Sequence, residues 1–159
     1  MACLRSRTFL LAFSCLGLLL LALSSSPLAA QQPNKMRLKA ISFDDIKFEM
    51  KKKNPFKRSL LTKEIVALED QLIKIRGYIL PSFQQDGITR FVLVRDNMQC
   101  CFGPGAALYD CIVVEMESGK STSFTVRPVT VEGVFTVHEY KGPDGKHLAI
   151  YHVRGRSAE

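Results

Sequence analysis

The sequence predicts a mostly β protein: a small OB-like Greek-key barrel of five to six strands with one or two short N-terminal helices. Three observations support this fold class. Apolar segments of strand length recur at roughly ten-residue spacing between turn signals, little of the chain has helical periodicity, and two expected strands carry a central glycine, Gly77 or Gly133. A glycine inside a strand is typical of a tight bend or bulge where a barrel turns a corner. An open sandwich is the alternative architecture.

The first 30 residues have the order of a secretory signal peptide. Arg5 and Arg7 precede an apolar run over residues 9–23, and a short stretch of small residues then ends at Ala30. The apolar run is shorter than the ~20 residues that a membrane-spanning helix needs. We therefore expect cleavage near Ala30 and export to the periplasm or another extracytoplasmic space. Retention of the leader as an N-terminal anchor is the alternative.

The charge of the chain is modest. The whole sequence of 159 residues carries a formal charge of +7, and the leader holds two basic and no acidic residues, so the mature part carries +5. Much of that charge lies in the basic run over residues 51–58. We interpret this run as a solvated linker that contacts, at most, an anionic lipid surface. Export argues against a nucleic-acid partner, and the mature length is sufficient for one hydrophobic core.

The mature chain divides into a polar, basic N-terminal segment over residues 31–60 and a barrel domain over residues 61–155. Ser42 has the character of an N-cap, and it predicts a short helix that extends to Met50. Thr62 predicts the start of a second, very short helical turn.

Strands make up the rest of the barrel domain. Alternating apolar residues predict strands with one face toward the core, and glycine, proline and aspartate clusters mark the turns between them, most clearly in the hairpin loop over residues 140–146. From residue 155 onward we expect a tail. The predicted strands are residues 71–80, 90–95, 111–116, 123–126, 129–137 and 148–153.

Three cysteines remain in the mature chain: the adjacent pair Cys100 and Cys101, and Cys111 at the start of the next strand. Thiolates suit Zn and Cu(I), so these cysteines predict a soft-metal site at the loop between two strands, with His138 and His147 as further candidate ligands. The competing hypothesis is a disulfide between Cys101 and Cys111 that staples the loop. An odd number of cysteines would then leave one thiol unpaired.

The two candidate histidine ligands flank one hairpin loop. His138 ends the fourth main strand and His147 begins the last one, so antiparallel pairing could make them neighbours. The alternative is two exposed polar residues beside a turn. We expect His152 to be a buried histidine of the core.

Several stretches resemble the bacterial family called domain of unknown function 3299. They are residues 68–81, which end in Gly-Tyr-Ile-Leu-Pro, residues 91–94, the Cys-Cys-Phe-Gly loop from Cys100, and residues 129–134. The resemblance covers about residues 40–154. It implies an exported protein or lipoprotein without an assigned activity. The association of some relatives with metal-transport genes implies a role in metal handling. The chain departs from the family pattern at residues 69–71, where a turn glycine is expected, and it lacks a lipoprotein cysteine.

The leading hypothesis for function is an exported, non-catalytic binding protein that handles Zn or Cu through the Cys-Cys loop. The alternative is a structural or interaction module of the cell envelope whose cysteines only staple that loop. A thiol enzyme that uses Cys100 or Cys101 with His138 and Glu139 is the weakest alternative, because no local signature joins a nucleophile to a base and an orienting acid. Tyr78, Phe83 and Phe102 are expected to form an apolar rim near the loop that suits a protein partner.

Overall fold

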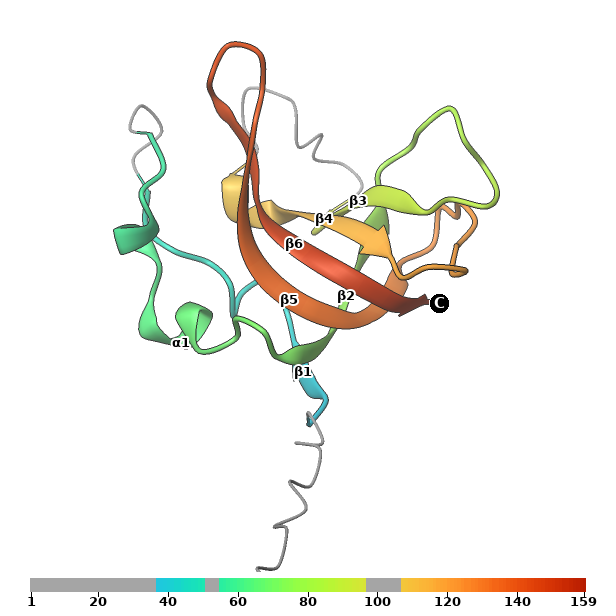
Figure 1. The fold of residues 1–159 in the computed structure, drawn as a ribbon, viewed down its shortest axis with the longest axis horizontal. Coiled ribbons are helices and arrows are strands. Elements are labelled where there is room, and N and C mark those ends of the chain that lie inside the picture. Colours follow the sequence, from blue (N-terminus) through green and yellow to red (C-terminus); the bar gives the residue numbers. More distant parts are fainter. Residues whose placement is uncertain (1–36, 51–54, 97–106) are drawn as a thin grey trace, which may run out of the picture. The chain divides into compact units, whose positions relative to one another are not determined.

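The computed structural model describes residues 37–50, 55–96 and 107–159. Six strands of this part form one sheet in the order β1-β2-β3-β4-β6-β5, and an additional pairing of β2 with β5 closes β2 to β6 into a ring (Figure 1). The elements are β1 (Lys39–Ile41), η1 (Arg58–Leu60), α1 (Lys63–Val66), β2 (Leu72–Ile79), β3 (Arg90–Val94), η2 (Leu108–Asp110), β4 (Cys111–Met116), β5 (Val129–Lys141) and β6 (His147–Ala158).

The ring confirms the predicted fold class. Within the ring, neighbouring strands are antiparallel except β4 and β6, which run parallel. β1 adds to β2 in parallel, outside the ring. A closed, mostly antiparallel set of five strands with a Greek-key order agrees with an OB-like barrel.

Four predicted strands are confirmed, those over residues 71–80, 90–95, 111–116 and 129–137, but the C-terminal end was predicted too short. The expected last strand over 148–153 continues to Ala158, and the expected tail is strand as well. β6 continues because β4 and β5 both pair with it. The backbone N–H groups of Thr130 and Glu159 each donate to the carbonyl of the other residue, which holds the chain end in place.

Two smaller predictions were wrong. Residues 123–126 form no strand, because the pairing there is limited to a single bridge between Ile88 and Thr122. The helix expected from Ser42 is a turn over residues 43–46. There the Ser42 N–H and hydroxyl both donate to the Asp45 carboxylate, at 2.7 and 2.8 Å, which favours a turn over a continuing helix. The helical turn predicted after Thr62 is confirmed as α1, with the Thr62 hydroxyl accepting from the Ile65 N–H.

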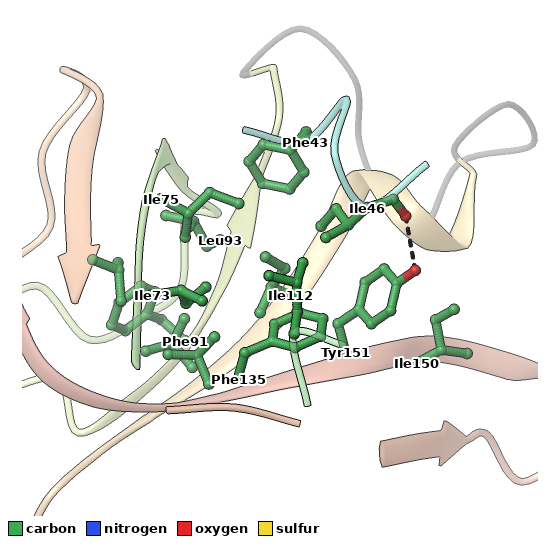
Figure 2. Packing of buried hydrophobic residues seen from close by; sticks show 14 of the residues in the cluster. Phe43, Ile46, Ile73, Ile75, Phe91, Leu93, Ile112, Phe135, Ile150 and Tyr151 are labelled. Carbon is green, nitrogen blue, oxygen red and sulfur yellow. Dashed lines mark hydrogen bonds between the residues drawn. The ribbon is translucent and has the colours of Figure 1, made fainter. Parts of the chain in front are cut away.

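The described part of the N-terminal segment belongs to the barrel core. Four of its side chains are buried in the main hydrophobic cluster: Phe43, Ile46, Phe48 and Phe56. The Tyr151 hydroxyl of β6 donates to the Ile46 carbonyl at 2.8 Å, as Figure 2 shows. Because this bond is buried and joins residues 105 positions apart, it ties the segment to the barrel.

The missing turn glycine has a structural counterpart. Asp70, which precedes β2, has a φ angle of 60°, in the left-handed region that glycine adopts most readily. Its N–H donates to the Phe135 carbonyl at 2.8 Å. Aspartate tolerates this conformation better than most residues with a side chain. The turn expected at residues 69–71 is therefore present, with aspartate in place of glycine.

Candidate functional site

The barrel strands carry a second apolar cluster on the face opposite the core. Along β4, Ile112 and Val114 belong to the main core, while Cys111 and Val113 belong to the second cluster. β3 alternates in the same way, so the two clusters lie on opposite faces of these strands. We call the second cluster the outer-face cluster. Its buried members are Val94, Cys111, Val113 and Ala149, and Tyr78, Leu80, Val92 and Tyr140 pack against them.

A pocket of about 330 Å³ opens on this cluster. Three parts of the fold build it: the loop after β2, strands β3 and β4, and the two arms of the β5–β6 hairpin. In OB-like barrels the corresponding strands and loops form the usual ligand-binding face. Its lining is mostly apolar and consists of Leu80, Pro81, Ser82, Arg90, Phe91, Val92, Cys111, Val113, Tyr140, Leu148 and Ala149.

Cys111, one of the predicted site residues, lies in the wall of this pocket. Its side chain is buried, and its Sγ atom lies 3.6 Å from the Leu148 carbonyl oxygen and 3.8 Å from that of Leu108. The Arg95 N–H donates to the Asp110 carbonyl at 3.0 Å, so the two ends of the loop between β3 and β4 meet next to Cys111. The fold therefore brings the base of the Cys-Cys loop to the edge of the pocket.

Cys100, Cys101 and Phe102 lie outside the described residues. The predicted metal set and the predicted Cys101–Cys111 disulfide both depend on them. Within residues 37–50, 55–96 and 107–159, no three His, Cys, Asp or Glu side chains are grouped closely enough to hold a metal ion.

The two candidate histidine ligands have different neighbours. His147 lies against Phe56, and its Nε2 atom is 2.7 Å from a Glu139 carboxylate oxygen. That hydrogen bond is the largest of the effects that lower the pKa of Glu139. His138 instead packs against Tyr140, at 4.6 Å between ring centroids.

His138 belongs to a polar cluster that sequence reasoning missed. Its ring lies 6.4 Å from that of His152, whose Nε2 atom is 3.7 Å from a Glu115 carboxylate oxygen. The Arg90 guanidinium lies 5.6 Å from the centroid of Tyr140. Because Arg90 and Tyr140 also line the pocket, this cluster adjoins it. The sequence signal was the alternation of Thr136, His138 and Tyr140 along one strand.

His152 was expected in the core, but it is half-buried and lies opposite Thr136 of β5. Its Nδ1 atom is 3.3 Å from the Thr136 hydroxyl. Burial is the main cause that lowers the pKa of His152, and the nearby His138 and Arg90 act in the same direction. The Glu115 carboxylate has the opposite effect and raises the pKa of His152.

This environment predicts that His152 makes stability depend on pH. A histidine whose pKa is lowered by folding favours the folded state when it is neutral. Its contribution is therefore fully present above the unfolded pKa of about 6.5 and is lost as pH falls from there through the lower folded pKa. We expect the free energy of unfolding to decrease between pH 7.5 and 5.5, and His152→Gln to reduce that decrease. Urea denaturation at pH 7.5 and 5.5 measures this difference in unfolding free energy. The exposed control Arg127→Gln should keep the pH dependence of the unsubstituted protein. An unchanged pH dependence in His152→Gln would contradict the assignment.

Two residues of the predicted rim, Tyr78 and Phe83, lie within the described part of the chain. Tyr78 is half-buried in the outer-face cluster, whereas Phe83 is fully exposed in the loop after β2.

Together these features define a class: a mostly β, OB-like barrel with a largely apolar pocket on its outer face. The chain belongs to the family described as "Protein of unknown function (DUF3299)", whose model matches residues 24–158. The resemblance inferred from the motifs is thereby confirmed.

The chain is similar to a solved structure of a DUF3299 family protein from Pseudomonas aeruginosa PAO1. The two share 16% sequence identity with a TM-score of 0.53, over 77% of this chain and 95% of the other. This likeness concerns the fold. A search of curated proteins finds no match. Among the helices of the described residues, none has the length and apolar character to span a membrane.

Proposed function

We propose that the protein is an exported, non-catalytic binding protein whose ligand occupies the outer-face pocket. The pocket itself carries this proposal. Its walls come from three separate parts of the fold, and its volume lies within the range of small-molecule sites, roughly 300–1,000 Å³. The leader over residues 1–30 supports export.

The more specific form of the proposal is that the protein handles a soft metal ion, Zn or Cu, through Cys100, Cys101 and Cys111. The position of Cys111 supports this form, because its thiol lies in the pocket wall and the ends of the Cys-Cys loop meet beside it. Thiolates bind both metals well. His147 packs against Phe56, whereas His138 packs against Tyr140. Because the two histidines have different neighbours, we favour the three cysteines over the histidines as metal ligands.

The alternative is an envelope interaction module in which Cys101 and Cys111 form a disulfide. The same position of Cys111 favours it, because the loop returns to this residue. The exposed Phe83 would then belong to a surface that contacts a protein partner.

Metal content and thiol count separate these two forms. The exported protein is purified without oxygen, its Zn and Cu are measured by mass spectrometry, and its thiols are counted after denaturation. About one metal ion per chain, lost in the double variant Cys100→Ser/Cys101→Ser and retained in the exposed control Ser118→Ala, supports the metal site. One thiol per chain without metal supports the disulfide. Three thiols without metal would contradict both.

A further inference from the structure

We propose that the outer-face pocket takes a small amphipathic anion, with an apolar chain or ring in the pocket and a carboxylate held at the rim by Arg90. This inference rests on the pocket binding proposed above and names the class of ligand. The pocket shares Cys111 with the proposed metal site, but Arg90 and the aliphatic lining that carry this inference belong to neither the metal set nor the proposed disulfide.

The apolar part of the ligand follows from the floor and walls. Val92, Val113 and Ala149 come from three different strands and present only aliphatic groups. Leu80, directly after β2, and Leu148, on β6 beside Ala149, extend this surface. Burial of an apolar group is worth about 25 cal/mol for each Å² removed from water. A pocket at the small end of the range for ligand sites suits one short chain or one ring better than a polymer.

The anionic part follows from the charges of the lining. Arg90 is the one formally charged residue of the lining within the described part of the chain, and no carboxylate lines the pocket there. Its guanidinium lies over the Tyr140 ring, and in the described residues it makes no ion pair within 4.0 Å. A guanidinium without a carboxylate partner can bind a ligand carboxylate through two parallel hydrogen bonds.

Neighbouring groups strengthen this preference for an anion. Burial raises the pKa of Tyr140, which keeps its hydroxyl protonated and able to donate. The Ser82 hydroxyl also belongs to the lining, and it donates to the Gln84 carbonyl at 3.1 Å. The acidic residue that faces Arg90 across the strand pair, Glu115, is largely exposed and lies 3.7 Å from His152. The rim therefore offers an anion one full positive charge, from Arg90, and one neutral hydroxyl donor, from Tyr140.

Octanoate and its uncharged analogue octanamide test the proposal, because they share one apolar chain and differ in charge. Both are titrated into the isotope-labelled exported protein, and binding is followed by backbone amide shifts in NMR spectra. We expect octanoate to shift residues of β3, β4 and the hairpin, and octanamide to bind at least tenfold more weakly. Arg90→Gln should remove the difference, whereas the exposed control Arg127→Gln should retain it.

A second variant tests the location. Val92→Trp places a large side chain in the pocket from a half-buried position and should abolish binding of both compounds, while the dispersion of its spectrum reports whether it folds. If Val92→Trp does not fold, Ala149→Leu serves the same purpose.

Equal binding of octanoate and octanamide would overturn the anion proposal and leave pocket binding intact. Shifts confined to another surface, or octanoate binding unchanged in Arg90→Gln, would overturn it as well. Such a carboxylate could come from the C-terminus of a peptide or from a lipid-like acid, and competition by N-acetyl-leucine distinguishes the two. Displacement of octanoate by N-acetyl-leucine supports a peptide C-terminus. Octanoate binding without displacement supports a lipid-like acid.

Discussion

Gly133→Ala is expected to destabilise the barrel by about 3 kcal/mol, the upper part of the range for overpacked sites. A β-carbon at this position would overlap the Arg154 carbonyl oxygen and lie 2.6 Å from Cγ1 of Val153. The register of β5 against β6 shifts between Glu132 and Gly133, so the two backbones approach closely at an irregularity. Since the clashing atom is a backbone oxygen of the paired strand β6, relief requires separation of β5 from β6.

Gly142→Ala is the matched control for this substitution. A β-carbon there would meet an Asp144 carboxylate oxygen at 3.1 Å, and that side chain is exposed and can move aside. We expect a change in the free energy of unfolding below about 1 kcal/mol. Chemical denaturation of both variants measures the contrast. Similar stabilities for the two would contradict the close approach at Gly133.

Ile46→Ala is expected to cost about 2–5 kcal/mol, as large-to-small substitutions in cores do. The Ile46 side chain is fully buried, and its carbonyl accepts the hydrogen bond from Tyr151 (Figure 2). Loss of the side chain would leave a cavity between the N-terminal turn and β6. If the segment were a linker separate from the barrel, Ile46→Ala would have almost no effect on stability. The measured loss of unfolding free energy therefore tests whether the segment belongs to the core.

Leu38→Ala provides the comparison on the same segment. Leu38 is 46% exposed, and its truncation should change stability by no more than about 0.5 kcal/mol. Thermal or urea unfolding of the two variants gives the difference directly. Equal effects of Ile46→Ala and Leu38→Ala would contradict the packing of this segment against the barrel.

The barrel strands could be predicted from the sequence because the alternation of apolar residues that marks them is a local pattern. Ile73, Ile75 and Ile79 share the buried face of β2, as their spacing predicts. The glycine pattern was also informative, since Gly133 lies at a strand irregularity. The chain end was harder to predict: Arg154 and Arg156 alternate with Gly155, and the strand there depends on pairing with two distant strands.

The site was predictable only in part, because it depends on contacts between distant residues. Cys111 was singled out from its position at a strand start, and it lies in the pocket wall. Its neighbours Leu80 and Ala149 carry no chemical signal and become part of a site only when the ring closes. The N-terminal segment was misread for a related reason: Phe43 and Ile46 are spaced much as in a helix, and their burial depends on a barrel formed later in the chain.

The central claim is that the outer-face pocket is the ligand site of this barrel. A crystal structure of the exported protein with bound octanoate tests it most directly. We expect electron density for the octanoate chain between Val92, Val113 and Ala149, with its carboxylate within hydrogen-bond distance of the Arg90 guanidinium. An empty pocket in crystals grown at saturating octanoate, or octanoate bound on another face, would contradict the claim.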